Sequence, residues 1–167
     1  MDELFALAPL MAQQGIRRLL VLSGEPDWAQ TQAAHFRARA EPVLWVGPQA
    51  HAAPWCAPGK LVTLLGREFQ HAIFDARQGF DVAAFAALAG TLRAGSWLLL
   101  LVPEWESWPH RIDRDSLRWS DAADAIATPI FVHHFRRVMG NHAQALLWRQ
   151  DQPFPPIDLP PRPYWRR

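Results

Sequence analysis

The sequence predicts an α/β fold of three layers, in which a mostly parallel sheet of about five strands carries helices on both faces. Short apolar runs typical of buried strands recur along the chain, and stretches with helical spacing of apolar residues separate them. Strands that alternate with helices form parallel sheets through right-handed crossovers. Single cores close at roughly 100 to 200 residues. The 167-residue chain therefore fits one such core.

The helices are predicted from spacing and from end signals. Apolar residues from Leu4 to Met11 recur at helical spacing, and Gly15 follows where a C-cap would lie. A second helix is predicted over residues 28–40 with Asp27 as its N-cap. Two more are predicted over residues 81–93, before Gly95, and over residues 128–139, with Thr128 as N-cap and Pro129 at the first helical position.

The strands are predicted from short apolar runs. They cover residues 17–23, 43–46, 71–76, 96–102 and 143–148. The run at 96–102, SWLLLLV, is the most apolar, which places it at the centre of the sheet because only a strand covered on both sides is apolar throughout. Residues 47–59 contain three prolines and favour a loop. Residues 61–65 fit a strand or a helical turn equally.

Composition restricts the class of partner and the compartment. The formal net charge of +1 gives no global field of the kind that attracts nucleic acid, so any RNA contact must be local. Cys56 is the single cysteine, which excludes an internal disulfide and a zinc site with several thiolates, and the cytoplasm is the expected location. The first residues lack a basic signal region, and no apolar run reaches the roughly 18 residues of a membrane span.

The motifs that would indicate catalysis or a cofactor are missing from the sequence. The first predicted turn, SGEPDW, has one glycine, no lysine and two acids, so it matches neither GxGxxG nor GxxxxGK[ST]. The seven histidines are scattered, and Ser23 does not lie in a GxSxG elbow. We therefore expect no catalytic residue, no metal and no cofactor within this chain.

A crevice at the carboxyl ends of the strands is the first candidate site. Ser23, Asp75 and Pro103 each follow or end a predicted strand, where open parallel sheets commonly bind ligands. A free-standing small-molecule or nucleotide-binding protein using this crevice is the alternative function. Asp75, with Asp81, fits equally a structural role in ordering the following turn and helix.

A segment rich in tryptophan and arginine, residues 104–120, is the second candidate site. Its members are Trp105, Trp108, Arg111, Arg114, Arg118 and Trp119. Tryptophan and arginine stack on bases and pair with phosphates in single-stranded RNA, and they also anchor protein interfaces. Three interpretations stay open: docking to another domain, a packed surface loop, or an RNA contact.

The chain ends in a proline-rich segment. Residues 151–163 contain six prolines and no periodic apolar pattern, which is typical of an extended linker. The expected organisation is a single α/β domain over residues 1–150 and a linker over residues 151–167 toward a downstream domain.

Several ordered blocks of the sequence are similar to one known family. They are GIRRLLVLSG (15–24), LLGREF (64–69), FDARQGFD (74–81), AFAALAGTLRAGSWL (84–98), DSLRWSD (115–121) and LLWRQ (146–150). In this order they resemble the N-terminal domain of bacterial tRNA(Met) cytidine acetyltransferases. The resemblance spans nearly the whole chain.

The resemblance implies a function that the residues alone do not. It implies a larger enzyme that uses acetyl-CoA, ATP and magnesium to acetylate the wobble cytidine of elongator tRNA(Met). The present domain would precede an ATPase module of the RNA-helicase type and an acetyltransferase domain. The nucleotide and acetyl-CoA sites would belong to those domains, so no catalytic residue is carried over. A non-catalytic, Rossmann-like or helicase-like accessory domain that docks on the ATPase module and helps to position tRNA is the expectation.

Overall fold

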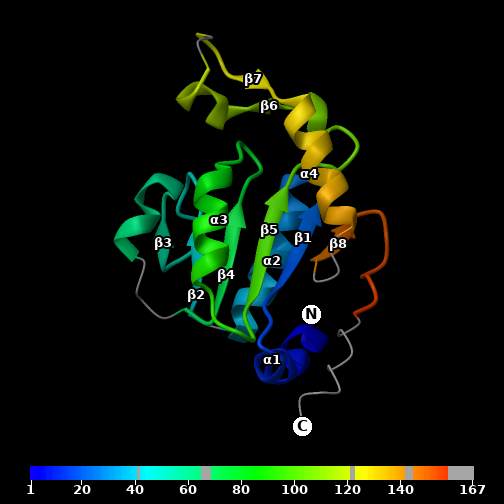
Figure 1. The fold of residues 1–167 in the computed structure, drawn as a ribbon. Coiled ribbons are helices and arrows are strands. Elements are labelled where there is room, and N and C mark those ends of the chain that lie inside the picture. The colour runs from blue at the N-terminus through cyan, green and yellow to red at the C-terminus, as the bar shows by residue number, and fades with distance from the viewer. Residues whose placement is uncertain (41, 65–68, 121–122, 142–144, 158–167) are drawn as a thin grey trace.

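The computed structural model describes residues 1–40, 42–64, 69–120, 123–141 and 145–157. A six-stranded parallel sheet in the order β3-β2-β4-β5-β1-β8 forms its centre (Figure 1). The strands are β1 (Arg18–Ser23), β2 (Val43–Val46), β3 (Trp55–Cys56), β4 (His71–Asp75), β5 (Trp97–Val102) and β8 (Ala145–Arg149). The predicted α/β class and parallel sheet are confirmed, with β3 as a short strand at one edge.

Four helices complete the three layers. Helix α2 (Pro26–Ala40) covers one face, with α1 (Asp2–Gln14) beside it where the strands begin, whereas α3 (Val82–Thr91) and α4 (Pro129–Asn141) cover the other (Figure 1). No helix in the described part of the chain is long and apolar enough to cross a membrane.

The pleat of the sheet divides the core between the two faces. In β1, Leu20 and Leu22 pack with α1 and α2, while Val21 between them packs with α3 and α4. All six residues of β5 are buried, and β5 lies between β4 and β1. The prediction that SWLLLLV forms a central strand is confirmed.

The helix ends follow the predicted signals in part. Gly15 ends α1 in the left-handed conformation, at φ 72°, and the Asp81 carboxylate caps α3 by accepting from the Ala84 amide. The prediction of Asp27 as a cap is wrong, because α2 begins at Pro26 and Asp27 lies inside its first turn. Thr128 directly precedes α4 as predicted, and its carbonyl accepts from the Val132 amide, but its buried hydroxyl has no hydrogen-bond partner.

The structure corrects the prediction for residues 47–59 and decides between the two alternatives for residues 61–65. Residues 47–59, expected as a loop, contain β3, which forms because the backbone amides of Trp45 and Gly47 donate to Pro54 and Cys56. Residues Pro58–Leu64 form a 3-10 helix, so the ambiguous stretch is a helical turn over its described residues. Residue 65 lies outside the described residues.

The segment after β5 leaves the body of the domain before α4 begins. It contains the 3-10 helices η2 (Trp108–His110) and η3 (Arg114–Arg118) and the antiparallel strands β6 (Ile112–Asp113) and β7 (Ile126–Ala127). The pair β6–β7 projects beyond the carboxyl ends of the main strands (Figure 1).

The proline-rich segment starts by packing on the domain. The rings of Trp148 and Phe154 lie 4.9 Å apart, the Trp148 indole donates to the Gln152 carbonyl, and Ile157 packs against the α2 side of the core. The rest of that segment, residues 158–167, and positions 143–144 of the last predicted strand lie outside the described residues.

Candidate functional site at the carboxyl edge of the sheet

The strands β1 and β5 are neighbours whose connections leave in opposite directions. The chain passes from β1 through α2 to β2 behind the sheet, and from β5 through α4 to β8 in front of it. In open parallel sheets such a switch point is where ligands bind, outside the carboxyl ends of the strands. Ser23 and Pro103, two of the three residues predicted to line a crevice, lie at this point.

The switch point is filled by the protein's own groups. The buried Ser23 hydroxyl donates to the Pro103 carbonyl at 2.8 Å, and the Ser23 carbonyl accepts from the Gln150 amide at 3.0 Å. The Gln150 side-chain oxygen accepts from the Glu25 amide at 2.7 Å. That amide belongs to the turn where a phosphate-binding loop would present its N–H groups, so Gln150 takes the place of an anion.

The first turn is closely packed around Gly24. A Cβ atom added at Gly24 would lie 2.7 Å from the Gln150 side chain and 2.8 Å from the Trp28 ring. Glycine is therefore the residue that fits at position 24 beside Gln150 and Trp28.

Asp75 belongs to a separate polar cluster. Strand β5 separates β4 from β1, and the Asp75 carboxylate faces Arg77 rather than Ser23. It accepts from Arg77 Nε at 2.8 Å, from an Arg77 terminal nitrogen at 2.9 Å and from the Arg77 amide at 3.1 Å. Arg77 also donates to the Pro26 carbonyl and the Gln30 side chain. This bidentate pair joins the turn after β4 to the start of α2.

The same turn is joined to the projecting segment. The Asp113 carboxylate accepts from the Phe80 and Asp115 amides, and the Arg114 amide donates to the Gln78 carbonyl at 2.8 Å. Gly79 lies against this junction, where an added Cβ would be 2.6 Å from the Asp115 nitrogen. Burial raises the pKa of the Asp113 carboxyl, and the hydrogen bonds from the two amides oppose that rise.

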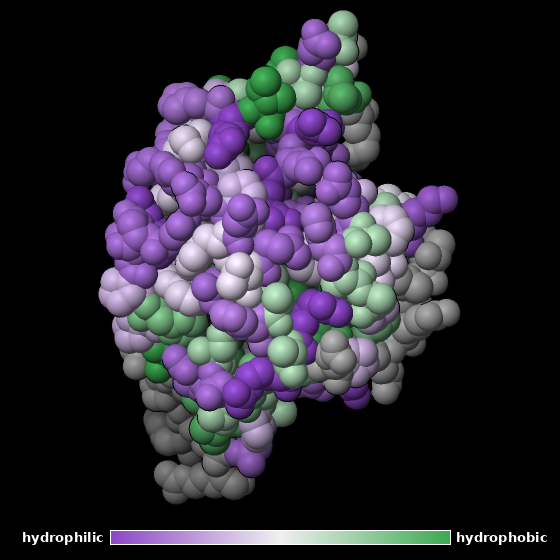
Figure 2. All heavy atoms as spheres, turned by 180° about the vertical axis from the view of Figure 1, so that it is seen from behind, coloured by the Kyte–Doolittle hydropathy of each residue, from purple (hydrophilic) through white to green (hydrophobic). Residues whose placement is uncertain are grey.

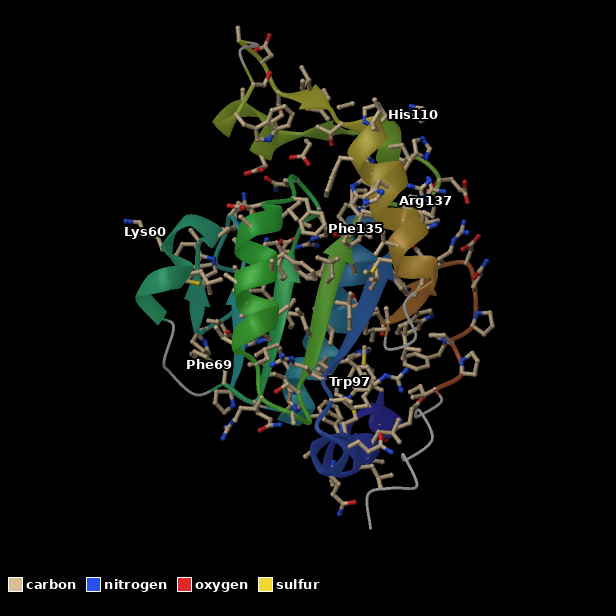
Figure 3. The ribbon with its side chains drawn as sticks, in the orientation of Figure 1. Lys60, Phe69, Trp97, His110, Phe135 and Arg137 are labelled. Carbon is tan, nitrogen blue, oxygen red and sulfur yellow. The ribbon has the colours of Figure 1, made fainter. Side chains whose placement is uncertain are left out.

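The tryptophans of the second candidate site divide into two groups. Trp105 and Trp108 are buried. Trp108 packs against Phe80 and Phe135, which points from α4 toward the core in Figure 3, and the Arg136 guanidinium lies 5.3 Å from the Trp105 ring centre. These two rings attach α4 to the sheet and present no face to a partner in this structure.

The remaining members of the tryptophan and arginine segment lie outside. Trp119, Arg111 and Arg114 are exposed, while the side chain of Arg118 lies outside the described residues. The structure therefore separates the five described side chains of this segment into a buried and an exposed set.

No group of three histidine, cysteine, aspartate or glutamate residues within the described part of the chain is arranged to hold a metal ion. Cys56 is buried, and burial raises the pKa of its thiol, which opposes formation of the reactive thiolate.

Three residues that organise this edge escaped the sequence interpretation. Arg77 follows Asp75 by two positions, and this spacing was the one local signal for the pair. Gln150 and Asp113 act on segments 125 and 33 positions away, and no local pattern encodes such contacts.

The geometry defines a parallel α/β domain in which Ser23, Pro103 and Gln150 are hydrogen-bonded to the protein's own groups at the switch point. The family of the N-terminal part of tRNA(Met) cytidine acetyltransferase TmcA matches residues 1–150. Sequences of that enzyme from Salmonella typhimurium and Citrobacter koseri are 57% and 56% identical over 166 residues, and one from Yersinia pestis is 46% identical over 168 residues.

Each of these alignments covers 99% of this chain but about a quarter of the relative, 25%, 25% and 24% respectively. The chain belongs to the family of TmcA N-terminal domains. The predicted resemblance is confirmed.

Proposed function

We propose that this chain is a non-catalytic accessory domain of a tRNA(Met) cytidine acetyltransferase, and that it acts in the cytoplasm. The longer protein would acetylate the wobble cytidine of elongator tRNA(Met) with acetyl-CoA and ATP. This domain would dock on the ATPase module of the RNA-helicase type and help to position the tRNA. The observation that carries the proposal is the family match over residues 1–150, which together with the relatives places the chain in the first quarter of that enzyme.

The geometry supports the non-catalytic part of the proposal. Gln150 occupies the turn where a phosphate would bind, the Ser23 hydroxyl is bonded to Pro103, and Asp75 is paired with Arg77. A nucleotide-binding protein would keep these groups open to a ligand, so the alternative function has less support. ATP, magnesium and acetyl-CoA would be held by other domains of the longer protein.

Calorimetric titration of the 167-residue chain tests the proposal directly. ATP with magnesium, acetyl-CoA and tRNA(Met) would each be added separately at low and moderate salt. We expect no heat of binding from ATP or acetyl-CoA, and tRNA binding that is weak because the net charge is +1. Micromolar binding of ATP that is abolished by Asp75→Ala in a folded variant would show that the carboxylate serves a ligand and would overturn the accessory role.

A further inference from the structure

Large apolar side chains are concentrated on the projecting segment. Of the nine large hydrophobic residues exposed in the described part of the chain, five lie within residues 112–130. They are Ile112, Leu117, Trp119, Ile126 and Ile130, exposed by 64%, 52%, 58%, 38% and 87%, and together they are named the ribbon face. They occupy both sides of the β6–β7 pair, because Ile112 pairs with Ala127 whereas Ile126 pairs with Asp113. Figure 2 shows hydrophobic side chains at the end of the molecule that carries β6 and β7. Single exposed apolar residues are ordinary, but a cluster indicates an interaction surface.

A pocket lies beside Trp119 of the ribbon face and could accept a side chain of a partner. Phe80, Val82, Trp119 and Phe131 line it, with the Asp113 and Asp115 carboxyl groups also in its wall. Its volume is about 290 Å³, at or below the small end of the roughly 300 to 1,000 Å³ typical of small-molecule sites. This size suits one or two apolar side chains of a protein partner, and buried anchors of that kind supply most of the energy of protein interfaces.

The chemistry of the ribbon face favours protein over RNA. Four of its five members are aliphatic, and Trp119 is its single aromatic side chain. The tryptophans that could have stacked on bases, Trp105 and Trp108, are buried in the core. Asp113, Asp115 and Asp124 lie on the same segment as Arg111, Arg114 and Arg118, so the acidic groups offset the basic charge that would attract a phosphate backbone.

Hydrogen bonds and ring packing attach the projecting segment to the rest of the domain. The Asp113 carboxylate accepts a hydrogen bond from the Phe80 amide, and the Arg114 amide donates one to the Gln78 carbonyl. At its base, Trp108 packs on Phe135 with ring centres 5.7 Å apart. A surface that is already ordered loses little conformational entropy on association, which favours a stable contact.

We propose that the ribbon face is the surface through which this domain docks on another domain of the same polypeptide, and that an apolar side chain of that domain fills the pocket. The relatives supply the argument for this occupant, because the chain spans about a quarter of their length and three quarters of the polypeptide remain as a permanently tethered partner. This inference rests on the proposed accessory function and adds the surface that performs it.

The test uses the full-length protein with a site-specific protease site inserted after Ile157. Ile112→Glu/Ile130→Glu is the variant, and Val138→Glu is the matched control, because Val138 is also exposed on α4 but lies near the opposite end of the helix. All three substitutions lie at exposed positions, so the thermal midpoint of the 167-residue chain should match the unmodified chain in each variant.

After cleavage, we expect the N-terminal piece to co-elute with the remainder in the unmodified protein and in Val138→Glu, and to separate in the ribbon-face variant. Amide hydrogen exchange of residues 112–130 should be slower by about tenfold or more in the full-length protein than in the 167-residue chain.

The other outcomes identify which proposal fails. Separation of the piece in every protein would show that the domain does not dock, which overturns the proposed function as well. Co-elution in every protein would keep docking and overturn the ribbon face as its surface. Two further results would assign the face to a different partner: a dimer of the 167-residue chain that Ile130→Glu dissociates, or tRNA affinity that Ile130→Glu removes.

Discussion

At the scale of single residues, His71 links the start of the central strands to acid stability. Its ring is buried between Phe5 and Phe36, and its Nδ1 accepts from the Trp97 amide at 2.9 Å. Burial lowers the pKa of His71 to about 4. The folded protein therefore keeps a neutral imidazole at pH 7, with the proton on Nε2.

Protonation of His71 should destabilise the fold in acid. The unfolded chain, with an ordinary histidine pKa of about 6.5, binds the proton first as the pH falls. The free energy of unfolding should therefore decrease between about pH 6.5 and pH 4, by an amount on the order of 3 kcal/mol. Urea unfolding at pH 7 and pH 4.5 measures this.

His71→Gln should flatten that pH dependence, whereas His35→Gln, at an exposed histidine, should leave it unchanged. A His71 ring whose NMR signals titrate near pH 6.5 would contradict the explanation.

The Asp75–Arg77 ion pair has a structural role, because Arg77 also donates to Pro26 and Gln30 of α2. Arg77→Gln would leave a carboxylate that is 4% exposed without its bidentate partner. Removal of one partner from a buried pair costs about 3 to 5 kcal/mol, and we expect the lower part of that range because Arg77 is itself 11% exposed. Denaturant unfolding measures the loss.

The double variant Asp75→Asn/Arg77→Gln should recover part of that stability, because it removes the unpaired charge. The single variants Asp75→Asn and Arg77→Gln serve as the comparison. If the double variant loses the sum of their two losses in unfolding free energy, the carboxylate and the guanidinium do not depend on each other.

At the scale of elements, two glycines near α3 should respond oppositely to alanine. Gly95 adopts φ +90° in the turn before β5, and an added Cβ would lie 3.0 Å from the Ala8 carbonyl oxygen and from the Ala12 side chain. Gly95→Ala should therefore cost about 1 to 3 kcal/mol through backbone strain and contact with α1. Gly90 lies within α3, and an added Cβ meets nothing within 4 Å.

Gly90→Ala should stabilise the protein by about 0.5 to 1 kcal/mol, because alanine has the higher helix propensity. Thermal unfolding of both variants measures the difference. Equal effects at the two positions would show that the turn before β5 accepts an ordinary residue.

The sequence predicted elements well where the signal was local. The run SWLLLLV indicated the central strand because every residue faces a covered side, and Gly15 indicated the end of α1 because its conformation suits glycine. The two-residue strand β3 was missed because its pairing to β2 depends on neighbours in space. Asp27 was assigned as a cap two residues too late, since Pro26 already occupies a helical position.

The position of the candidate site could be predicted from the sequence, but the side-chain contacts that occupy it could not. The strand pattern placed Ser23 and Pro103 at one edge, since parallel strands end together. Closure of that edge by Gln150 depends on a contact across 125 positions. For the same reason the alternation of tryptophan and arginine could not distinguish the buried Trp105 and Trp108 from the exposed Trp119.

At the scale of the whole molecule, the polar groups at the carboxyl edge bind one another while the apolar surface lies on the projecting segment. Under the proposed function, the domain would contribute by fixing the relative orientation of its neighbours rather than by chemistry of its own. Its effect should therefore appear in the longer polypeptide and in steps that require several domains together.

Removal of residues 1–150 from the full-length protein should lower kcat/KM for tRNA acetylation by about tenfold or more, within the range of typical couplings between sites. The affinity for ATP should stay within about threefold of the intact protein, because the turn of this domain that would bind phosphate is filled by Gln150. Calorimetry with ATP and transfer of labelled acetyl groups to tRNA(Met) measure the two quantities on the same preparations. The full-length, uncleaved Ile112→Glu/Ile130→Glu variant should also have a lower kcat/KM for tRNA acetylation. Its loss should be smaller than that of the truncated protein, since the domain stays tethered. A large loss of ATP affinity on truncation, with the remainder still folded, would instead place a nucleotide-binding group in this domain.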